Sequence, residues 1–446
     1  MVSCDVVVVG LGPGGEHVAT ELAKAGLDVV AVDERLVGGE CPYYGCVPTK
    51  MMIAAATALR EAGRVAELAG SADISSSWAP VARRIRDEAT DDWDDAVAVK
   101  RLEDAGATFV RGRGVITGPR EVTVGGTSYG ARKGIVLNTG TTPSAPPIPG
   151  LDSVAYWTNR DVVQLAELPA SLVVIGGGAI GCEMAQVMAQ FGVQVTVVEV
   201  ADRLVAIEEP EASGVLERAF TELGVDVVTG AEVTDVSQEE DGFVVRLADR
   251  TVHAERLLVA AGRRNNLGGL GLEHVGLDPD ARVLDPDDHL RVADGVWAIG
   301  DITGKGAFTH VSMYQADVVI RDLLGQDGPW ADYRAVGRVT FTAPEIGSVG
   351  LSEAAAREQG LDVRVATGDL GSRGWLAREE GMVKLVADAR RGVLVGGCTA
   401  GPMGGEVLSM IVTAIHAEVP ISTLATMHFA YPTYHRALQP VLQQLL

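Results

Sequence analysis

The sequence predicts an α/β protein with two doubly wound parallel sheets and a C-terminal α+β domain. A strand, a glycine-rich turn, a helix and a second strand follow one another twice, from about residue 5 and from about residue 172. The segment GVWAIGD, at residues 295–301, reads as a further buried strand that ends in an acid. From about residue 335 the chain is first rich in strands and then helical. Strands that alternate with helices indicate parallel sheets, and strands followed by helices indicate an α+β domain.

The two copies of the repeat share one spacing. In the first copy, the strand DVVVVG is followed by the turn GLGPGG, a helical stretch and a strand that ends at Asp33. In the second copy, the strand LVVIG is followed by GGAIG, a helical stretch and a strand that ends at Glu199. The distance from Gly10 to Asp33 is 23 positions, and so is the distance from Gly176 to Glu199.

This context predicts a Rossmann-like dinucleotide-binding site in each copy. The first glycine of G-x-G-x-x-G allows the tight turn, the second lets the backbone approach a pyrophosphate, and the third lets the helix pack close to the strand. The helix N-terminus faces the phosphates, and the closing acid accepts hydrogen bonds from the ribose. Two glycine-rich turns without a ligand are the alternative, which the repetition of the whole context disfavours. The glycines are Gly10, Gly12 and Gly15 in the first turn and Gly176, Gly178 and Gly181 in the second.

The acid that closes the second copy also predicts which nicotinamide cofactor binds. A carboxylate at Glu199 would repel a 2′-phosphate, which prefers an arginine as its partner. The nearest arginine, Arg203, lies four residues further along the chain. NAD is therefore favoured over NADP.

The composition excludes several classes of function. The net charge is −23 and no basic stripe is present, which argues against binding to nucleic acid. We expect the acidic run DDWDD, at residues 91–95, to be solvated surface. No run of about 18 apolar residues could span a membrane, and the N-terminus lacks the features of a signal peptide. A cytoplasmic protein is therefore expected.

Two of the five cysteines, Cys41 and Cys46, lie close together in GGECPYYGCVPTK, just after the first repeat. In a cytoplasmic protein such a pair indicates redox or metal chemistry. Zinc would need two more ligands, and no cluster of cysteine and histidine is near, so no metal site is predicted. The segment is expected to open a helix, whose N-terminus stabilises a thiolate, with Lys50 on the same face as Cys46.

The chain resembles the class I pyridine nucleotide-disulfide oxidoreductases, the group of lipoamide dehydrogenase, glutathione reductase and mercuric reductase, along essentially its whole length. GLGPGG resembles the FAD fingerprint of the family, and GGECPYYGCVPTK resembles its GGTC-x4-C-x3-K redox motif. GGGAIGCE resembles the NAD(P)H fingerprint and VWAIGD the second FAD motif. The remaining matches are NTGTTP with the short T-G loop, AAGRRNN with the A-x-G-R-x-x-N segment, and FTAPEIGSVGLSE with the opening of the dimerisation domain.

The resemblance implies a homodimer whose active site is shared across subunits and which reduces a small-molecule electron acceptor. No nucleic-acid or membrane partner is expected. The proline-rich connector TTPSAPPIPG marks a domain boundary. The expected domains are the first part of an FAD-binding domain with the cysteine pair at 1–150, an NAD(P)H-binding domain at 151–265, a central second part of the FAD-binding domain at 266–330, and a dimerisation domain at 331–446.

The resemblance also implies roles for the matching residues. Cys46 would face the flavin, and Cys41 would attack the substrate. Lys50 would pair with Glu183 beside the flavin N5. Asp301 would bind the ribityl chain of FAD. The other positions implied in cofactor binding are Pro13, Gly14, Glu34, Gly39, Glu40, Gly114, Thr139, Gly140, Ile180, Gly262, Arg263, Gly300 and Thr309.

The C-terminus departs from the family pattern. Disulfide-reducing members carry H-P-T-x-x-E, in which the histidine is the acid–base catalyst and the glutamate orients it. In HFAYPTYHRAL, Tyr431 stands at the histidine position and Arg436 at the glutamate position. Our hypothesis is that Tyr431 is the acid and that His435, on the same face of a continuing helix, is its relay. The alternative is that both side chains only pack at the dimer interface.

The leading hypothesis for function is an NAD(P)H-dependent FAD oxidoreductase that passes electrons through Cys41 and Cys46 to a disulfide or a thiol-bound acceptor. A reductase of quinones, metal ions or other small acceptors, which uses the reduced flavin directly, is the second hypothesis. Tyr43 and Tyr44 would then shape a site for a flat substrate, or they would only fill space. A redox-sensing flavoprotein with little turnover is less favoured, because Lys50 and both fingerprints are intact.

Overall fold

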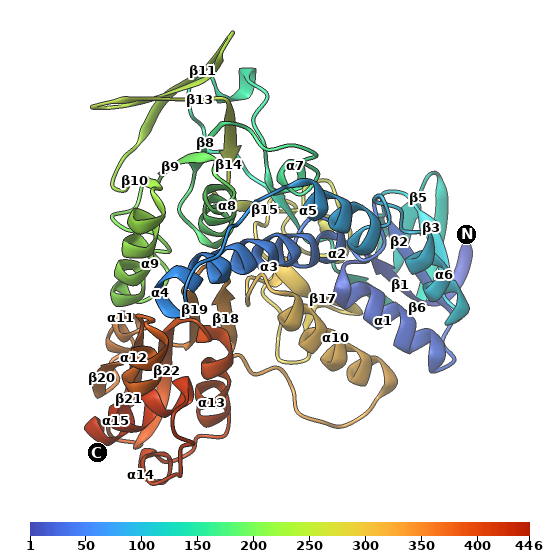
Figure 1. Cartoon of the computed structure of the whole chain (residues 1–446). Coiled ribbons are helices and arrows are strands. Elements are labelled where there is room, and N and C mark those ends of the chain that lie inside the picture. Colours follow the sequence, from blue (N-terminus) through green and yellow to red (C-terminus); the bar gives the residue numbers. More distant parts are fainter. The chain divides into compact units, whose positions relative to one another are not determined.

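The structure is a computed structural model that describes residues 1–446. The chain divides into two compact units, each of which combines three stretches of sequence. Figure 1 colours the chain by sequence, so each unit contains ribbons of several colours. The first unit comprises Met1–Thr49, Arg83–Ser144 and Arg263–Tyr333, and the second comprises Lys50–Ala82, Ala145–Gly262 and Arg334–Leu446.

The first unit is built on an eight-stranded sheet. Its strand order is β16-β17-β6-β1-β2-β3, and the hairpin strands β4 and β5 extend it through β6. Strands β17, β6, β1, β2 and β3 run parallel, as the repeat of strand and helix predicts. The strands are β1 (Val2–Val9), β2 (Val29–Asp33), β3 (Thr108–Arg111), β4 (Val115–Gly118), β5 (Glu121–Val124), β6 (Thr127–Leu137), β16 (Arg291–Ala293) and β17 (Val296–Ala298).

Both faces of this sheet are buried. Val6 and Val8 of β1 pack in one apolar cluster with helices α1 and α10, which lie side by side in Figure 1. Val7 and Val9 point to the opposite face and pack in a second cluster. Burial on both faces explains why β1 ends in four consecutive valines, Val6–Val9. The helical segments of this unit are α1 (Pro13–Lys24), α2 (Glu40–Tyr43), η1 (Ile85–Ala89), α6 (Ala96–Asp104), η3 (Leu272–Val275), η4 (Gly300–Thr303) and α10 (Thr309–Leu324), and a two-stranded ladder joins β7 (Thr141–Pro143) to β15 (Arg263–Asn265).

The second unit contains the second repeat. Four parallel strands in the order β10-β9-β8-β14 form a Rossmann-like sheet. Between β10 and β14 the chain forms a separate antiparallel sheet of β11, β12 and β13. The strands are β8 (Ser171–Ile175), β9 (Gln194–Val198), β10 (Asp226–Val228), β11 (Val233–Glu239), β12 (Gly242–Leu247), β13 (Thr251–Ala254) and β14 (Arg256–Val259). The helical segments are α4 (Val65–Leu68), η2 (Leu151–Ser153), α7 (Asn159–Val162), α8 (Ala179–Gln190) and α9 (Pro210–Leu223), while α3 (Cys46–Gly63) and α5 (Ala79–Arg84) cross from one unit to the other.

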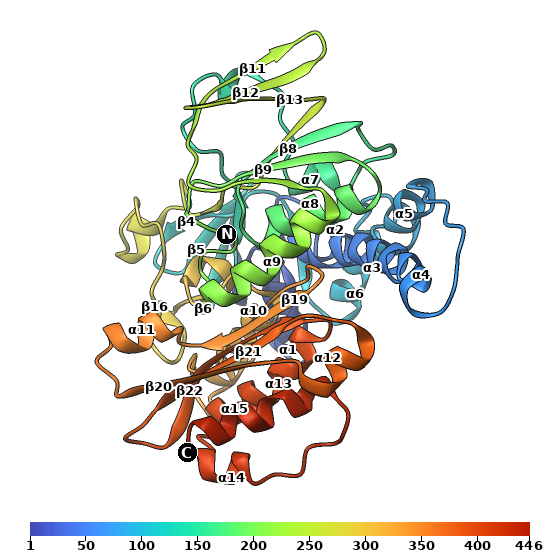
Figure 2. The same cartoon turned by 60° about the vertical axis from the view of Figure 1, so that its left-hand side comes forward.

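The C-terminal part of the second unit is an antiparallel five-stranded sheet, β18-β19-β22-β21-β20, with helices packed against one face. Figure 2 shows α13, α14 and α15 together below the strands. The predicted α+β domain is thus confirmed. The strands are β18 (Gly337–Thr340), β19 (Glu345–Gly350), β20 (Val363–Asp369), β21 (Met382–Asp388) and β22 (Val393–Gly401), and the helices are α11 (Glu353–Glu358), α12 (Gly371–Ala377), α13 (Gly404–His416), α14 (Ile421–Ala425), η5 (Tyr434–Ala437) and α15 (Leu438–Gln444).

The acidic run DDWDD is solvated, as the sequence predicts, at Asp91, Asp92 and Asp94, which are exposed, but not at its last residue. The Asp95 side chain is buried, and its Oδ2 accepts a hydrogen bond from the Val37 amide at 2.7 Å. Asp91, Asp92 and Trp93 have φ angles of 48°, 54° and 59°, in the left-handed region that non-glycine residues rarely adopt. Only the end of the run therefore turns inward, where the Asp95 carboxylate is hydrogen-bonded.

Every helix in the chain is either too short or too polar to cross a membrane.

Candidate active site

The first glycine-rich turn has the close contacts that its glycines predict. Gly10 has a φ of 93°, and a Cβ there would lie 2.3 Å from the Asn138 carbonyl oxygen. A Cβ on Gly15 would overlap the Gly10 carbonyl oxygen. The acid of the repeat closes the turn, because Asp33 accepts hydrogen bonds from the amides of Leu11 and Arg35, both at 2.7 Å. Burial raises the pKa of Asp33, and these two amide bonds counteract the shift.

The second turn repeats this geometry. A Cβ on Gly181 would overlap the Gly176 carbonyl oxygen, just as a Cβ on Gly15 would overlap the Gly10 carbonyl oxygen. Glu199 accepts hydrogen bonds from the amide of Gly177 at 2.5 Å and from the amide of Ala201 at 2.8 Å. Each acid is therefore held by the residue after the first glycine and by the residue two positions beyond itself. A Cβ on Gly178 would meet no atom within 4 Å, so this backbone is open to the approach of a phosphate.

The first turn and its surroundings fit FAD. The Thr139 hydroxyl is buried without a protein partner, as expected for a group that a cofactor satisfies. Gly39 has a φ of 69°, and a Cβ there would lie 2.8 Å from the Gly12 Cα, so the cysteine segment begins directly against the turn. Pro13 occupies the first turn of α1, where its missing N–H costs nothing. When bound, FAD and the nicotinamide supply the electron pair for the reduction of a disulfide.

The cysteine pair lies at the junction of two helices. Cys41 is in α2, and α3 begins at Cys46, as the sequence predicts. The Cys46 Sγ lies 3.5 Å from the Thr309 Oγ1 at the start of α10. The pKa of Cys41 is strongly raised, chiefly because the Cys41 thiol hydrogen-bonds to the Cys46 sulfur and secondly because of burial. The raised pKa keeps the Cys41 thiol protonated.

A network of polar side chains connects the start of this segment with Asp301. Glu40, the residue before Cys41, forms an ion pair with Arg263 at 3.2 Å. Arg263 donates to the Thr141 hydroxyl at 2.7 Å, and Thr141 donates to Asp301 Oδ2 at 2.7 Å. The network places the residue expected to hold the ribityl chain three contacts away from Glu40.

The predicted pair of Lys50 and Glu183 is present in the second unit. The Lys50 Nζ lies 2.8 Å from Glu183 Oε2 and 4.6 Å from the centre of the Phe341 ring. The other carboxylate oxygen of Glu183 accepts a hydrogen bond from the Phe341 amide at 2.8 Å. Both oxygens of a buried carboxylate are thus engaged, which fixes the position of the ammonium group.

The proposed relay from Tyr431 to His435 rests on a wrong premise, because no helix contains both residues. Tyr431 lies in a turn, and the following short helix η5 begins only at Tyr434. His435 packs against other residues, with its Nε2 2.8 Å from the Met410 Sδ and its ring 5.1 Å from that of Phe429. The Pro432 between them cannot supply the amide that a continuing helix needs.

Tyr431 itself is exposed, with 66% of its surface accessible in the single chain. The Arg436 guanidinium lies 5.4 Å from the centre of the Tyr431 ring. The two residues that replace the family's dyad therefore lie side by side in a cation–π arrangement.

Two residues of the site were assigned no role from the sequence. Thr141 joins Arg263 to Asp301, and only its place beside the T-G loop could have indicated it. Asn138, with its amide oriented to satisfy its neighbours, accepts from the Gly15 amide at 2.8 Å and donates to the Ile299 carbonyl at 3.1 Å. Its position directly after β6 is the only sequence signal.

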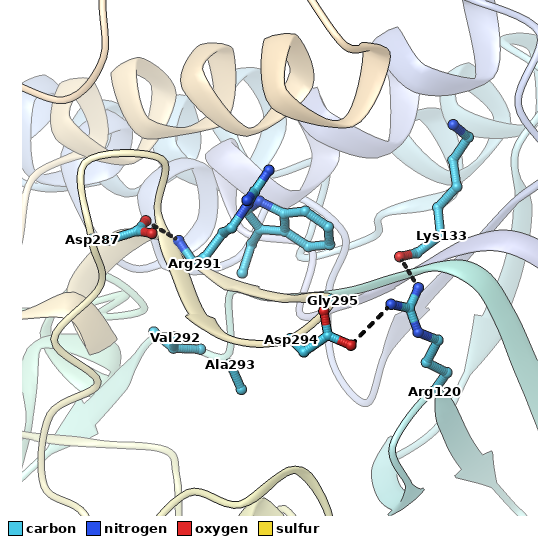
Figure 3. A pocket seen from close by; sticks show the side chains of 9 residues that line it. Arg120, Lys133, Asp287, Arg291, Val292, Ala293, Asp294 and Gly295 are labelled. Carbon is cyan, nitrogen blue, oxygen red and sulfur yellow. Dashed lines mark hydrogen bonds and ion pairs between the residues drawn. The ribbon is translucent and has the colours of Figure 1, made fainter.

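A pocket of about 520 Å³ in the first unit lies apart from this network (Figure 3). Both arginines that line it are engaged by protein groups: Arg120 contacts Asp294 and the Lys133 carbonyl, and Arg291 pairs with Asp322, which lies outside the lining. None of the predicted site residues lines this pocket.

Two family models match the chain. The model described as pyridine nucleotide-disulphide oxidoreductase matches residues 4–316, and that of its dimerisation domain matches residues 336–441. Dihydrolipoyl dehydrogenase from Halobacterium salinarum is 32% identical over 99% of this chain and 96% of the relative. Mercuric reductase from Streptomyces lividans is 33% identical over 98% of this chain and 94% of the relative.

Solved structures agree with these matches. The Cu(II) complex of the HOCl-induced flavoprotein disulfide reductase RclA from Escherichia coli has a TM-score of 0.87 at 26% identity, with 100% of both chains covered. LpdA from Mycobacterium tuberculosis has a TM-score of 0.86 at 27% identity, also over 100% of both chains. The chain therefore belongs to the class I pyridine nucleotide-disulfide oxidoreductase family and is an FAD-dependent oxidoreductase.

Proposed function

We propose that the enzyme uses NADH to reduce the Cys41–Cys46 disulfide and that the resulting dithiol reduces a disulfide or a thiol-bound acceptor. The observation that carries this proposal is the position of Cys46 at the start of α3, beside the Thr309 hydroxyl, with Cys41 in the helix α2 just before it. Reduction of the disulfide to a Cys41 thiol and a Cys46 thiolate takes two electrons and one proton. NADH contributes all of these as a hydride and leaves as NAD⁺.

The two sulfurs have different roles in this proposal. The N-terminus of the 18-residue helix α3 favours negative charge on Cys46. Contact with Cys46 and burial raise the pKa of Cys41, so that Cys41 is the sulfur that carries the proton. The Thr309 hydroxyl can donate a hydrogen bond to Cys46, which supports a thiolate there.

NAD is the proposed nicotinamide cofactor. The Glu199 carboxylate is fixed by two amides at the end of β9, where a 2′-phosphate would be repelled. Arg203 is directed elsewhere, because its guanidinium donates to the Ala206 carbonyl at 2.6 Å. The ratio of kcat/KM for NADH and NADPH tests this choice, and a higher value for NADPH would contradict it.

A reductase of small acceptors, such as quinones or metal ions, is the second candidate. It is supported by the replacement of the acid–base dyad with Tyr431 and Arg436, since an acceptor that takes electrons without releasing a thiolate needs no such acid. The aromatic site suggested for a flat substrate receives no support from Tyr43, which is buried with 6% of its surface exposed.

The remaining assignments are also proposals. The dimerisation domain supports a homodimer, and we propose that Tyr431 completes the active site of the other subunit. The domain limits 1–150, 151–265, 266–330 and 331–446, and the cofactor contacts of the predicted site residues, stay predictions. A cytoplasmic location also stays a proposal, with which the sparse cysteines agree.

An anaerobic titration with NADH tests the leading proposal. After two-electron reduction we expect a long-wavelength charge-transfer band from the Cys46 thiolate, followed by turnover with members of a panel of disulfides. The variant with both Cys41→Ser and Cys46→Ser should lose the band and all disulfide reduction. Full turnover of this variant with quinones or metal ions, together with no disulfide activity in the wild type, would favour the second candidate.

A further inference from the structure

The acidic run at residues 91–95 is joined to the redox loop, which we define as residues 37–46. The Trp93 Nε1 donates a hydrogen bond to the Tyr43 carbonyl at 3.1 Å. The Asp95 carboxylate accepts a hydrogen bond from the Val37 amide at 2.7 Å and pairs with Arg111 at 2.5 Å. The acidic run thus holds the redox loop at Val37, the first residue of the loop, and again at Tyr43, between the two cysteines.

The segment that makes these bonds has an unfavourable backbone conformation. Asp91, Asp92 and Trp93 are three consecutive non-glycine residues in the left-handed region. In that region the Cβ of an L-residue comes close to the following carbonyl oxygen. The amide of Asp92 donates to the Arg86 carbonyl at 2.7 Å, which helps to hold the turn. Strain of this kind persists only where the surroundings determine it, and it gathers at functional sites.

The Tyr43 carbonyl is a sensitive point of the redox loop. Helix α2 has only four residues, so the carbonyls of its last turn have no partner within the helix. Two residues separate its end from the start of α3 at Cys46. A Cβ on Gly45 would lie 3.1 Å from the Glu40 carbonyl oxygen, so this link is already tight. The orientation of α2 therefore sets the distance from Cys41 to Cys46.

We propose that Trp93 is a positioning residue of the redox reaction, which through the Tyr43 carbonyl holds Cys41 next to Cys46. Asp95 secures the start of the same loop. The proposal rests on the proposed function in so far as this pair carries electrons. Because a disulfide forms only within a narrow range of sulfur positions, the two bonds favour the oxidised pair.

The test is the equilibrium between the cysteine pair and dithiothreitol in the FAD-loaded enzyme. The Cys41 and Cys46 thiols lose two electrons and two protons as their S–S bond forms, and oxidised dithiothreitol gains both as its own S–S bond breaks. Alkylation and peptide mass measurement report the remaining dithiol. We expect Trp93→Phe to lower the equilibrium constant of disulfide formation by more than twofold and up to about tenfold, which is the range for one lost hydrogen bond. A tenfold change corresponds to about 30 mV.

Trp78 provides a matched control. Its Nε1 donates to the Leu165 carbonyl at 2.8 Å, so Trp78→Phe loses the same kind of bond without touching the redox loop. We expect Trp78→Phe to leave the equilibrium constant within twofold of the wild type. An unchanged constant in Trp93→Phe, or equal shifts in both variants, would overturn the proposal.

A second variant keeps the proposal testable if Trp93→Phe does not fold. Asp95→Asn weakens the bond to Val37 with almost no change in shape, and it must shift the constant in the same direction. An unchanged constant in Asp95→Asn then counts against the proposal. The measurement does not depend on turnover. If the double cysteine variant retains disulfide reduction, the proposed function fails while the shift in Trp93→Phe still stands.

Discussion

The Arg263 guanidinium lies 3.2 Å from the Glu40 carboxylate and 2.7 Å from the Thr141 hydroxyl. Both side chains of the ion pair are mostly buried, so removal of one partner leaves a poorly solvated charge. Glu40 stands where the family motif has threonine, and the ion pair gives this replacement a structural role. The pair joins the residue beside Cys41 to the network that ends at Asp301.

A double-mutant cycle measures this pair. We expect Glu40→Gln and Arg263→Met to be coupled by about 0.5–3 kcal/mol in the free energy of unfolding, because the residues share one network. Asp104→Asn is the control, since the pair of Lys100 and Asp104 is exposed and such pairs contribute little. Additive effects of the two variants would show that Glu40 and Arg263 do not depend on one another.

The pair of Lys50 and Glu183 leads to a prediction about catalysis. Lys50→Met removes a charge-assisted hydrogen bond to Glu183, which is worth about 1.5–3 kcal/mol. If this bond positions the ammonium group at the flavin, the rate of enzyme reduction by NADH falls about ten- to a hundredfold. Stopped-flow absorbance under anaerobic conditions measures this rate. Lys50→Arg is the control, because it keeps the charge and should recover part of the rate; equal rates in all three proteins would exclude the role.

The parts of the fold that the sequence predicts are those set by local pattern. The glycine turns, the acids Asp33 and Glu199 and the start of α3 follow from spacing and from the steric need for glycine. The buried position of Asp95 does not follow from local pattern. An acidic run is expected to be solvated unless the long-range partner of Asp95, the Val37 amide, is known.

The C-terminal error has a related cause. Four-residue spacing indicates a shared face only inside a helix, and between Tyr431 and His435 the chain forms a turn around Pro432. The contacts among Glu40, Arg263 and Thr141 join stretches more than 100 positions apart, so no local pattern could show them.

Lys384 is predicted to be essential for the stability of the second unit. It is 3% exposed, and its ammonium group contacts the carboxylates of Glu209, Glu211 and Glu353 at 2.8–3.0 Å. Burial alone would lower the pKa of Lys384, but the three carboxylates raise it above its usual value. Lys384→Met would leave the carboxylates without their common cation and should cost about 3–5 kcal/mol in the free energy of unfolding. Denaturant unfolding measures the loss, and a loss below about 1 kcal/mol, the usual value for exposed ion pairs, would contradict the prediction.

His435 should make the stability of the protein depend on pH. Burial lowers the pKa of His435, so near its unfolded pKa of about 6.5 the unfolded chain binds a proton that the folded chain does not. Its contribution to stability is therefore complete above that pH and is lost as the pH falls below it. Unfolding at pH 7.5 and pH 5.5 should show a smaller difference for His435→Gln than for the wild type. Equal differences would mean that His435 titrates normally in the folded protein.

A comparison with the neighbouring Tyr434 can distinguish a role of Tyr431 as the acid from a role in packing only. Tyr431→Phe removes only a hydroxyl, and a general acid contributes about 10²–10⁴ in rate, so kcat for a disulfide should fall by at least about a hundredfold. Reduction of an artificial acceptor by the flavin should not change. Tyr434→Phe is the matched control, because Tyr434 also lies beside an arginine, with the Arg373 guanidinium 5.5 Å from its ring centre. If both variants keep full disulfide activity, Tyr431 only packs, and the loss of the histidine and glutamate then points to an acceptor that needs no proton from this position.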